Sequence, residues 1–246
     1  NHAKYHPFMH KLQQDRDYYD IFLFNMQGDL VYSVFKELDY ATNLMSGEWK
    51  ASGLARVFNA ASKSTTQGFV VFDDFSPYAP SFNAPASFIA TPILENGKPI
   101  GVLSFQMPIA RINSIMQASQ GMGETGETYI VGDDFLMRSD SRFSEESTIL
   151  NVKVDTQTSG RAIKGETGVE TAQDYRGVSV FSAYTSLEFN GTNWAVLAEI
   201  DADEVNTPTT NLLYMVLALL LVGVIVSTLI GIGFGRSIAI PLSNIV

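Results

Sequence analysis

The longest apolar run in the chain is Leu212–Phe234, which consists mainly of Leu, Val, Ile, Gly and Met. No Asp, Glu, Lys, Arg or His occurs from Val205 to Gly235. At about 1.5 Å of rise per residue, a helix of this length covers the ~30 Å hydrocarbon layer of a bilayer. The alternative is a helix buried in a soluble core, but such a helix is rarely apolar on every side. The pattern therefore predicts one membrane-spanning helix.

The flanks of this run indicate its orientation. Asp201, Asp203 and Glu204 precede it, whereas Arg236 follows it directly. Because basic residues are retained on the cytoplasmic side, we expect residues 1–204 to be extracytoplasmic and the chain after Arg236 to be cytoplasmic. Several glycines in the span would permit the close approach of a second helix, as in a dimer. They are Gly223, Gly231, Gly233 and Gly235.

Before the apolar run, strand-like segments occur twice in the same order. Each half opens with an apolar segment, a polar turn and a return segment. These are Asp20–Phe24 and Leu30–Val34 in the first half, and Thr128–Val131 and Phe135–Ser139 in the second. Each half closes with a longer pair around an Asn-Gly turn. These are Ser87–Leu94 and Pro99–Met107, then Val180–Leu187 and Asn193–Ile200. Apolar segments joined by such turns predict β-hairpins.

Helical segments complete the pattern of the first half. Leu54, Val57 and Phe58 share one face of a helix predicted within Ser52–Ser62. A second helix is predicted at Ile109–Gln117, after the closing hairpin. A hairpin, a helical crossover and a second hairpin form a small antiparallel sheet with helices on one side. The predicted fold class is therefore α+β, with two tandem modules of this kind followed by one transmembrane helix.

Composition agrees with a folded, acidic outer region. Of the 246 residues, 46% are hydrophobic and 17% are charged, a balance that allows a sizeable core. The formal net charge is −10, and residues 1–204 carry 15 Lys and Arg against 26 Asp and Glu. Such a body repels phosphate backbones, so we expect no nucleic-acid partner. The absence of cysteine excludes disulfides, thiolate metal sites and cysteine nucleophiles.

Several strings of the sequence resemble one family. DIFLFNMQGDLVYSVFKELDYATNL, SGLARVF, DFSPYAPS, PASFIATPI and GVLSFQMPIARIN resemble the membrane-distal half of a double Cache (dCache) sensor. GETGETYIVGDDFLMRSDSRF and WAVLAEIDADEV resemble its membrane-proximal half. GRSIAIPLSNIV is similar to the start of a HAMP linker, in which a Pro-Leu pair follows the membrane helix. The resemblance covers almost the whole chain, in the family's order.

The resemblance implies PAS-like modules in a bacterial transmembrane receptor of the inner membrane, most like a methyl-accepting chemotaxis protein. It also implies a small-molecule ligand in the distal module, and a homodimer that passes a helix movement to the HAMP linker. The alternative owners are a histidine kinase and a nucleotide cyclase, because the sequence contains no output domain. We expect the sequence to be a piece of a longer protein. Residues 1–19 would be the end of a long N-terminal helix. The distal Cache module would be 20–118 and the proximal one 119–204, with a boundary near Gly121–Gly126. Residues 205–235 would form the transmembrane helix and 236–246 the start of the HAMP linker.

Polar and aromatic residues that interrupt the core pattern of the distal module are the candidates for ligand contact. A cation such as Lys36 could pair with a ligand carboxylate, and Asp74 could accept a hydrogen bond from a ligand amine. Tyr78 or Trp49 could form a wall of the pocket. For each candidate the alternative is a structural role, in the core or in solvent. The full set is Tyr32, Lys36, Asp39, Trp49, Asp74, Tyr78 and Ser81.

The ligand's chemistry stays open between a carboxylate and an amine. The amino-acid-binding subset of the family carries an Arg-x-Trp-Tyr arrangement before a Tyr-x-Asp. This sequence lacks that arrangement, since the only arginine near Trp49 is Arg56. In the proximal module, we expect Arg138 and Asp140 to make ion pairs that fix a loop of a transmitter module. A second pocket is the alternative there.

Candidates for catalysis fail, so we expect no enzyme, no cofactor and no metal site. His2, His6 and His10 recur at the spacing of one helix face, but a proline interrupts them and no acid completes a ligand set. The carboxylates of Asp73 and Asp74 are adjacent in sequence, and neighbouring strand residues point to opposite faces. A membrane-tethered enzyme and an adhesion module are the weaker alternatives to a ligand sensor.

Overall fold

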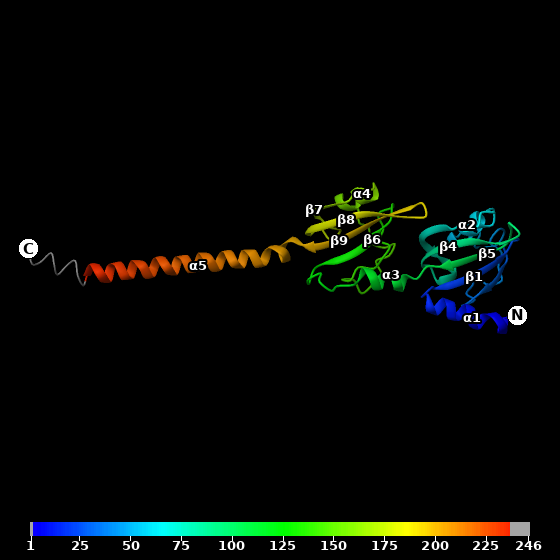
Figure 1. The fold of residues 1–246 in the computed structure, drawn as a ribbon, viewed down its shortest axis with the longest axis horizontal. Coiled ribbons are helices and arrows are strands. Elements are labelled where there is room, and N and C mark those ends of the chain that lie inside the picture. Colours follow the sequence, from blue (N-terminus) through cyan, green and yellow to red (C-terminus); the bar gives the residue numbers. More distant parts are fainter. Residues whose placement is uncertain (1, 237–246) are drawn as a thin grey trace, which may run out of the picture. The chain divides into compact units, whose positions relative to one another are not determined.

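The structure, a computed structural model, describes residues 2–236 of the chain (Figure 1). The chain divides into two compact units after Ile200. The first unit holds two modules, called here the first and the second module. The first contains α1 (His2–Asp15), β1 (Asp20–Asn25), β2 (Leu30–Ser33), α2 (Gly53–Ala61), β3 (Val71–Tyr78), the 3-10 helix η1 (Ala79–Ser81), β4 (Ala84–Glu95), β5 (Lys98–Gln106) and α3 (Ile109–Met116). The second contains β6 (Glu127–Val131), α4 (Gln157–Ile163), β7 (Gly168–Gln173), β8 (Ser179–Phe189) and β9 (Thr192–Asp201), and α5 (Ala202–Phe234) follows.

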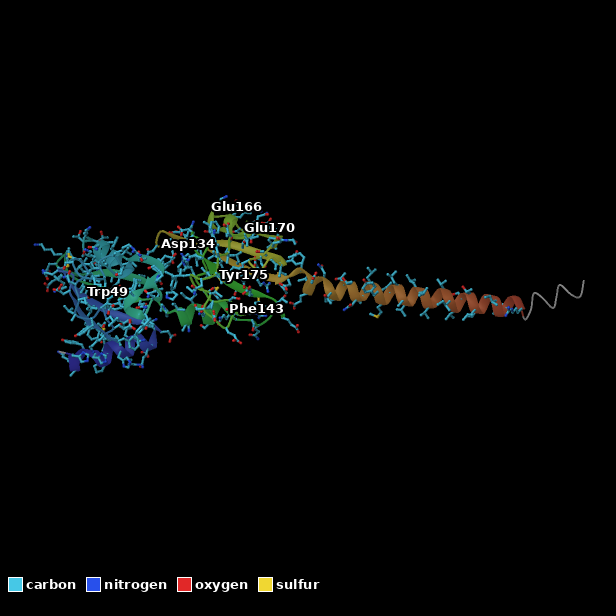
Figure 2. The ribbon with its side chains drawn as sticks, turned by 180° about the vertical axis from the view of Figure 1, so that it is seen from behind. Trp49, Asp134, Phe143, Glu166, Glu170 and Tyr175 are labelled. Carbon is cyan, nitrogen blue, oxygen red and sulfur yellow. The ribbon has the colours of Figure 1, made fainter. Side chains whose placement is uncertain are left out.

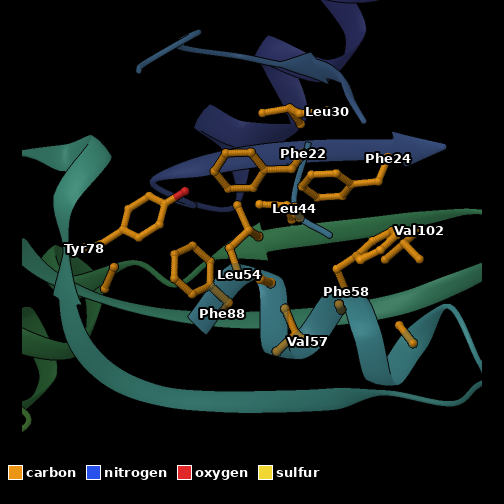
Figure 3. Packing of buried hydrophobic residues seen from close by; sticks show 14 residues of the cluster. Phe22, Phe24, Leu30, Leu44, Leu54, Val57, Phe58, Tyr78, Phe88 and Val102 are labelled. Carbon is orange, nitrogen blue, oxygen red and sulfur yellow. The ribbon is translucent and has the colours of Figure 1, made fainter. Parts of the chain in front are cut away.

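The first module is built on a five-stranded antiparallel sheet in the order β2-β1-β5-β4-β3. Because side chains alternate along a strand, Phe22, Phe88 and Val102 lie on one face and form a core with α2. Figure 3 shows α2 packed against this face, with Leu54 and Phe58 directed toward the strands. These helical positions are four residues apart, as the sequence pattern predicts.

The second module is built on a four-stranded sheet in the order β6-β9-β8-β7. Tyr129, Val131 and Leu197 from this sheet form a core with Ala162 of α4. Two antiparallel sheets with flanking helices confirm the predicted α+β class. The repeated order of opening and closing strands is also confirmed in outline.

Two segments differ from the hairpin pattern. Phe135–Ser139 forms no strand and makes only isolated bridges, because the backbone of Phe135 is left-handed (φ 65°) and Met137 bonds to Val152 instead. Conversely, Asp74 and Pro77 lie in a strand, β3, that is not among the hairpin strands predicted from the sequence. Pro77 lacks an N–H group, and β3 tolerates it because it lies at the edge of its sheet.

An apolar cluster joins the two modules. It contains Phe72 and Phe75 of β3, together with Ile130 of β6 and Trp194 of β9. The rings of Phe72 and Trp194 meet edge to face, with centroids 5.7 Å apart. A strand of the first module is therefore packed directly on strands of the second.

The second unit contains helix α5, which is long and apolar enough to cross a membrane. The predicted span Leu212–Phe234 forms its C-terminal part. In the sequence, Ala202 follows directly on Asp201, the last residue of β9. The predicted start of a HAMP linker lies outside the described residues, except for Arg236.

Candidate ligand site

The seven candidate residues lie in three places. Asp39, Trp49, Tyr78 and Ser81 belong to the side of the first sheet that α2 covers, or to the loops beside it. Tyr32 and Lys36 face α1 on the other side, and Asp74 faces the second module. Figure 2 shows Trp49 within the first module.

Asp39 and Tyr78 form the centre of the first group. The Tyr78 hydroxyl donates to Asp39 Oδ2 at 2.5 Å, and both residues are buried. Tyr78 ends β3 and packs its ring edge to face against Phe88, at one end of the core cluster (Figure 3). Asp39 comes from the loop after β2. The contact therefore joins two segments that are 39 residues apart in sequence.

A second contact joins the same two segments. Ser81 Oγ donates to Glu37 Oε2 at 2.5 Å, and the Tyr19 hydroxyl donates to Glu37 Oε1 at 2.8 Å. The backbones beside these contacts are left-handed at Lys36 (φ 55°) and Phe82 (φ 56°). Non-glycine residues adopt this conformation at a cost, and it often marks functional loops. The two loops are thus held together over Asp39.

Asp20 extends the group at the start of β1. Its Oδ1 accepts hydrogen bonds from the amides of Ile21 and Val34 at 2.7 and 2.8 Å. Burial raises the pKa of the Asp20 carboxyl to about 7, against those amides, and the charge of Asp39 raises it further. Burial likewise raises the pKa of Asp39. Carboxyl groups that share this low-dielectric region disfavour one another's ionisation.

Four buried side-chain atoms have no hydrogen-bond partner within the described residues, and all four lie in the first module. They are Asp39 Oδ1, Trp49 Nε1, Ser87 Oγ and Gln106 Oε1. Buried polar atoms are nearly always paired in folded proteins, so each of these needs a reason. We call Asp20, Glu37, Asp39, Tyr78 and Gln106 the Asp39 cluster.

Tyr32 and Lys36 are directed away from the Asp39 cluster. The Tyr32 hydroxyl lies 2.9 Å from Nδ1 of His6 on α1, and it lines a groove of about 490 Å³ between α1 and the sheet. Lys36 lies over the ring of Tyr40, with Nζ 5.9 Å from the ring centroid. Its charge contributes to the lowered pKa of His6, after burial and the charge of His2. These two residues therefore belong to the α1 side.

Asp74 makes its contacts with the second module. Nη2 of Arg138 lies 2.9 Å from Asp74 Oδ2, and Nε1 of Trp194 donates to Oδ1 at 3.1 Å. Both carboxylate oxygens are therefore occupied. Arg138 also pairs with Asp134 at 2.9 Å, so the predicted ion pair of Arg138 exists but with partners other than Asp140.

The second module has a buried polar group of its own, which the sequence reasoning did not single out. Glu199 accepts from the hydroxyls of Tyr129 and Ser182 at 2.6 and 2.7 Å. Glu127 lies directly opposite Glu199 in the sheet and accepts from the hydroxyls of Ser141 and Tyr175. Every carboxylate oxygen of this pair has a donor. The alternation of Glu127 and Tyr129 along one strand was the available signal.

No metal site is evident in the part of the chain that the structure describes. Within residues 2–236, no group of three or more His, Asp or Glu side chains is placed to hold a metal ion. His2, His6 and His10 stack along α1, with ring centroids 4.4 and 5.6 Å apart.

The described residues thus form two tandem antiparallel modules, and the first contains a buried polar group that is incompletely paired. The sequence model of the Cache domain family matches residues 1–209, and the chain belongs to this family. Comparison with curated protein sequences finds no match.

Solved structures show the same fold. The periplasmic sensory domain of the Campylobacter jejuni chemoreceptor Tlp1 aligns with a TM-score of 0.57 at 13% identity, over 82% of this chain and 78% of that one. The ligand-binding domain of the Pseudomonas aeruginosa amino acid chemoreceptor PctC, solved with GABA, aligns with a TM-score of 0.53 at 15% identity, over 82% of each chain. That of PctB, solved with L-Arg, gives 0.53 at 15% identity, over 82% of this chain and 88% of that one.

Proposed function

We propose that the chain is the extracytoplasmic ligand-sensing region of a transmembrane chemoreceptor of the inner membrane. A small molecule binds in the first module, and α5 carries the response across the membrane. The observation that supports this best is the contrast between the modules. Buried polar atoms without partners occur in the first, whereas the buried carboxylates of the second are fully paired.

The strands β3 and β9 connect the Asp39 cluster to α5. Tyr78 of the Asp39 cluster and Asp74 at the module boundary lie on the same strand, β3. A displacement of Tyr78 by a ligand would move the strand that contacts Trp194. Trp194 lies on β9, and α5 begins at the residue directly after β9. A ligand shifts such a system only if it binds one arrangement more tightly than the other.

PctC and PctB are amino acid chemoreceptors solved with GABA and L-Arg, and their shared fold supports a small-molecule ligand here. A histidine kinase or cyclase receptor remains the second candidate, since the sensor fold is shared among these outputs. Fusing the chain after Val246 to the output domain of a chemoreceptor or a kinase distinguishes them. We expect only one of the two fusions to respond to ligand, namely the one whose output domain continues the helical register of the chain.

The binding step is tested on the full chain in lipid nanodiscs. A thermal-shift screen against carboxylates, amines, purines and sugars should give at least one specific stabilisation. No stabilisation by any compound would contradict the sensor function. Turnover of a stabilising compound would support the membrane-tethered enzyme instead.

We also propose that the chain forms a homodimer. Cysteine crosslinking tests this, because the chain has no native cysteine that would crosslink in the background. Gly223, Ser227 and Gly231 lie four residues apart and share one face of α5. Small residues on one face permit close helix contact in a bilayer. We expect Ser227→Cys to crosslink in membranes and Ile225→Cys, on the opposite face, not to. Equal crosslinking of both would contradict a dimer through this face.

A further inference from the structure

An open groove of about 490 Å³ lies between α1 and the first sheet, on the face of the sheet that α2 does not cover (Figure 1). Most of its walls are aromatic or aliphatic. Tyr5 and Phe8 line it from α1, and Leu23 and Val31 line it from β1 and β2. Within the described residues no Asp or Glu lines this groove. Its volume is that of a site for a small organic molecule.

Strand β2 directs two successive side chains into the groove. Leu23 of β1 is opposite Tyr32 and Phe24 is opposite Leu30, so Val31 lies between them without a partner and forms a β-bulge. Successive residues of a regular strand point to opposite faces, but a bulge redirects one of them. Val31 and Tyr32 therefore both line the groove. The bulge places an aliphatic wall beside a hydroxyl group.

Helix α1 is only loosely held against this face. None of its residues is buried, and the rings of Tyr5 and Phe8 are 53% and 68% exposed. His6 Nδ1 lies 2.9 Å from the hydroxyl of Tyr32, which connects the helix to β2. A molecule in the groove would remove the exposed rings from water and fix α1 against the sheet.

Positive charge gathers around the groove, although Asp and Glu outnumber Lys and Arg by 26 to 15 in residues 1–204. Residues 2–11 contain three His and two Lys and no Asp or Glu. Lys4 Nζ lies 4.9 Å from the ring centroid of Tyr5, and Lys36 Nζ lies 5.9 Å from that of Tyr40. Both rings line the groove. Neither lysine takes part in an ion pair within the described residues. The groove therefore favours an anion.

The polar groups of the groove agree with this charge. Burial lowers the pKa of His6, and the charges of His2, Lys36 and His10 lower it further, so these groups lie close together. An anion among them would offset their mutual repulsion. The charge of Asp20 contributes, after burial, to the raised pKa of Tyr32. However, Asp20 does not line the groove, and its Oδ1 accepts hydrogen bonds from two backbone amides.

We propose that the groove between α1 and the first sheet binds a small aromatic carboxylate, whose charge pairs with Lys36 and Lys4 and whose ring packs on the aromatic walls. A neutral aromatic molecule would leave both lysines without a counter-charge. A carboxylate without a ring would leave the walls in water, and an aromatic ammonium ion would be repelled. This site lies on the other face of the sheet from the Asp39 cluster, so the inference goes beyond the proposed function.

The ligand class is tested on the full chain in nanodiscs by the shift of Tm with five compounds at equal ionic strength. They are benzoate, phenylacetate, acetate, benzyl alcohol and benzylammonium. We expect benzoate or phenylacetate to raise Tm by about 5–10 °C at a hundredfold excess over Kd. The other three compounds should bind at least about tenfold more weakly, because each lacks either the ring or the negative charge.

Two pairs of variants locate the site. Lys36→Met keeps the length of the side chain without its charge, and should weaken the aromatic carboxylate about tenfold. Lys164→Met, at an exposed lysine of the second module, should leave the Kd unchanged. Val31→Trp fills the groove and should abolish the shift, whereas Val169→Trp on β7 should not. Both valines are exposed, at 54% and 73%, so both variants should fold, and the Tm of each without ligand checks this.

Several results would overturn the inference. If neither aromatic carboxylate shifts Tm, the groove is not such a site; the sensor function would still stand, because it fails only if the broader screen is empty. A shift that persists in Val31→Trp would show that the compound binds elsewhere. Equal affinity for benzyl alcohol or benzylammonium would contradict the role of the lysines. If Val31→Cys crosslinks two copies in membranes while neither aromatic carboxylate binds, a second copy of the chain covers the groove instead.

Discussion

Arg138 Nε donates to Oδ2 of Asp74 on β3 at 3.0 Å, and Arg138 Nη2 lies 2.9 Å from the same oxygen. This ion pair joins the two modules. The Arg138 side chain is only 3% exposed, whereas that of Asp74 is 21% exposed. The preceding residue, Asp73, pairs with Arg56 of α2 instead. Adjacent residues of one strand thus connect β3 to the helix over the first core and to the second module.

The Asp74–Arg138 pair should contribute substantially to stability. Asp74→Ala leaves the buried Arg138 with Asp134 as its remaining ionic partner, and we expect a loss of about 2–4 kcal/mol. Arg56→Ala breaks a pair whose arginine is 54% exposed, and should cost less than about 1 kcal/mol. Denaturant unfolding of the full chain in detergent micelles measures both. Equal costs for the two variants would contradict a special role for the buried pair.

Trp194 should report a ligand bound in the first module. The sequence contains two tryptophans, so Trp49→Phe leaves Trp194 as the single reporter. Because its indole Nε1 donates to Asp74 at 3.1 Å, displacement of β3 should change its emission. We expect any ligand from the screen to shift the emission of the Trp49→Phe chain, and the shift to disappear in Trp49→Phe/Asp74→Ala. A ligand that binds without altering Trp194 would show that the modules are not coupled through this contact.

The sequence was sufficient for the architecture but not for the roles of single residues. Strand alternation, Asn-Gly turns and the apolar run are local signals, and they account for most of the strands and for the long helix, although Phe135–Ser139 forms no strand. β3 is not among the hairpin strands predicted from the sequence, because Asp73, Asp74 and Pro77 interrupt its apolar pattern. What makes it a strand is its edge position beside β4, a tertiary fact.

The candidate site shows the same limit. Tyr78 and Asp39 were both chosen for their chemistry, but sequence spacing gave no sign that they contact each other. Asp74 was chosen on equal grounds, and its partners come from the second module, 64 and 120 residues away. Which buried atom stays unpaired depends on every neighbouring donor, so no local pattern indicates Asp39 Oδ1 or Gln106.

Asp20 should give the first module a stability that decreases as pH rises. Burial raises its pKa from 3.8 to about 7, so the folded protein holds this proton more tightly than the unfolded chain does. The contribution is complete below pH 3.8 and is lost as pH rises through about 7. Asp20→Asn keeps an oxygen for the amides of Ile21 and Val34 but cannot ionise. The Tm of Asp20→Asn relative to that of wild type should increase between about pH 5 and about pH 8. A difference that does not vary with pH would contradict the raised pKa.

Close packing of α2 against β3 should make Gly53 intolerant of a side chain. A Cβ atom there would clash with Oδ2 of Asp73, which Arg56 holds in place, and would lie 3.1 Å from the ring of Phe88. We expect Gly53→Ala to cost about 1–3 kcal/mol through overpacking. Gly160 in α4 is the control, because its nearest neighbour, Phe135, would be 3.9 Å away. Gly160→Ala should stabilise by up to about 1 kcal/mol through helix propensity. If Gly53→Ala and Gly160→Ala shift the unfolding midpoint in the same direction, this account is wrong.

The phenol of Tyr78 should be more important for stability than its counterpart in the second module. Tyr78→Phe removes the donor to Asp39 Oδ2 while Oδ1 already lacks one, whereas Tyr129→Phe leaves Glu199 with Ser182. We expect a loss of about 1–3 kcal/mol at Tyr78 and a smaller one at Tyr129. Because the two groups of each pair are in contact, Asp39→Asn should reduce the cost of Tyr78→Phe by about 0.5–3 kcal/mol in a double-mutant cycle. Additive losses in that cycle, measured by denaturant unfolding, would show that the short Tyr78–Asp39 contact does not hold the two loops together.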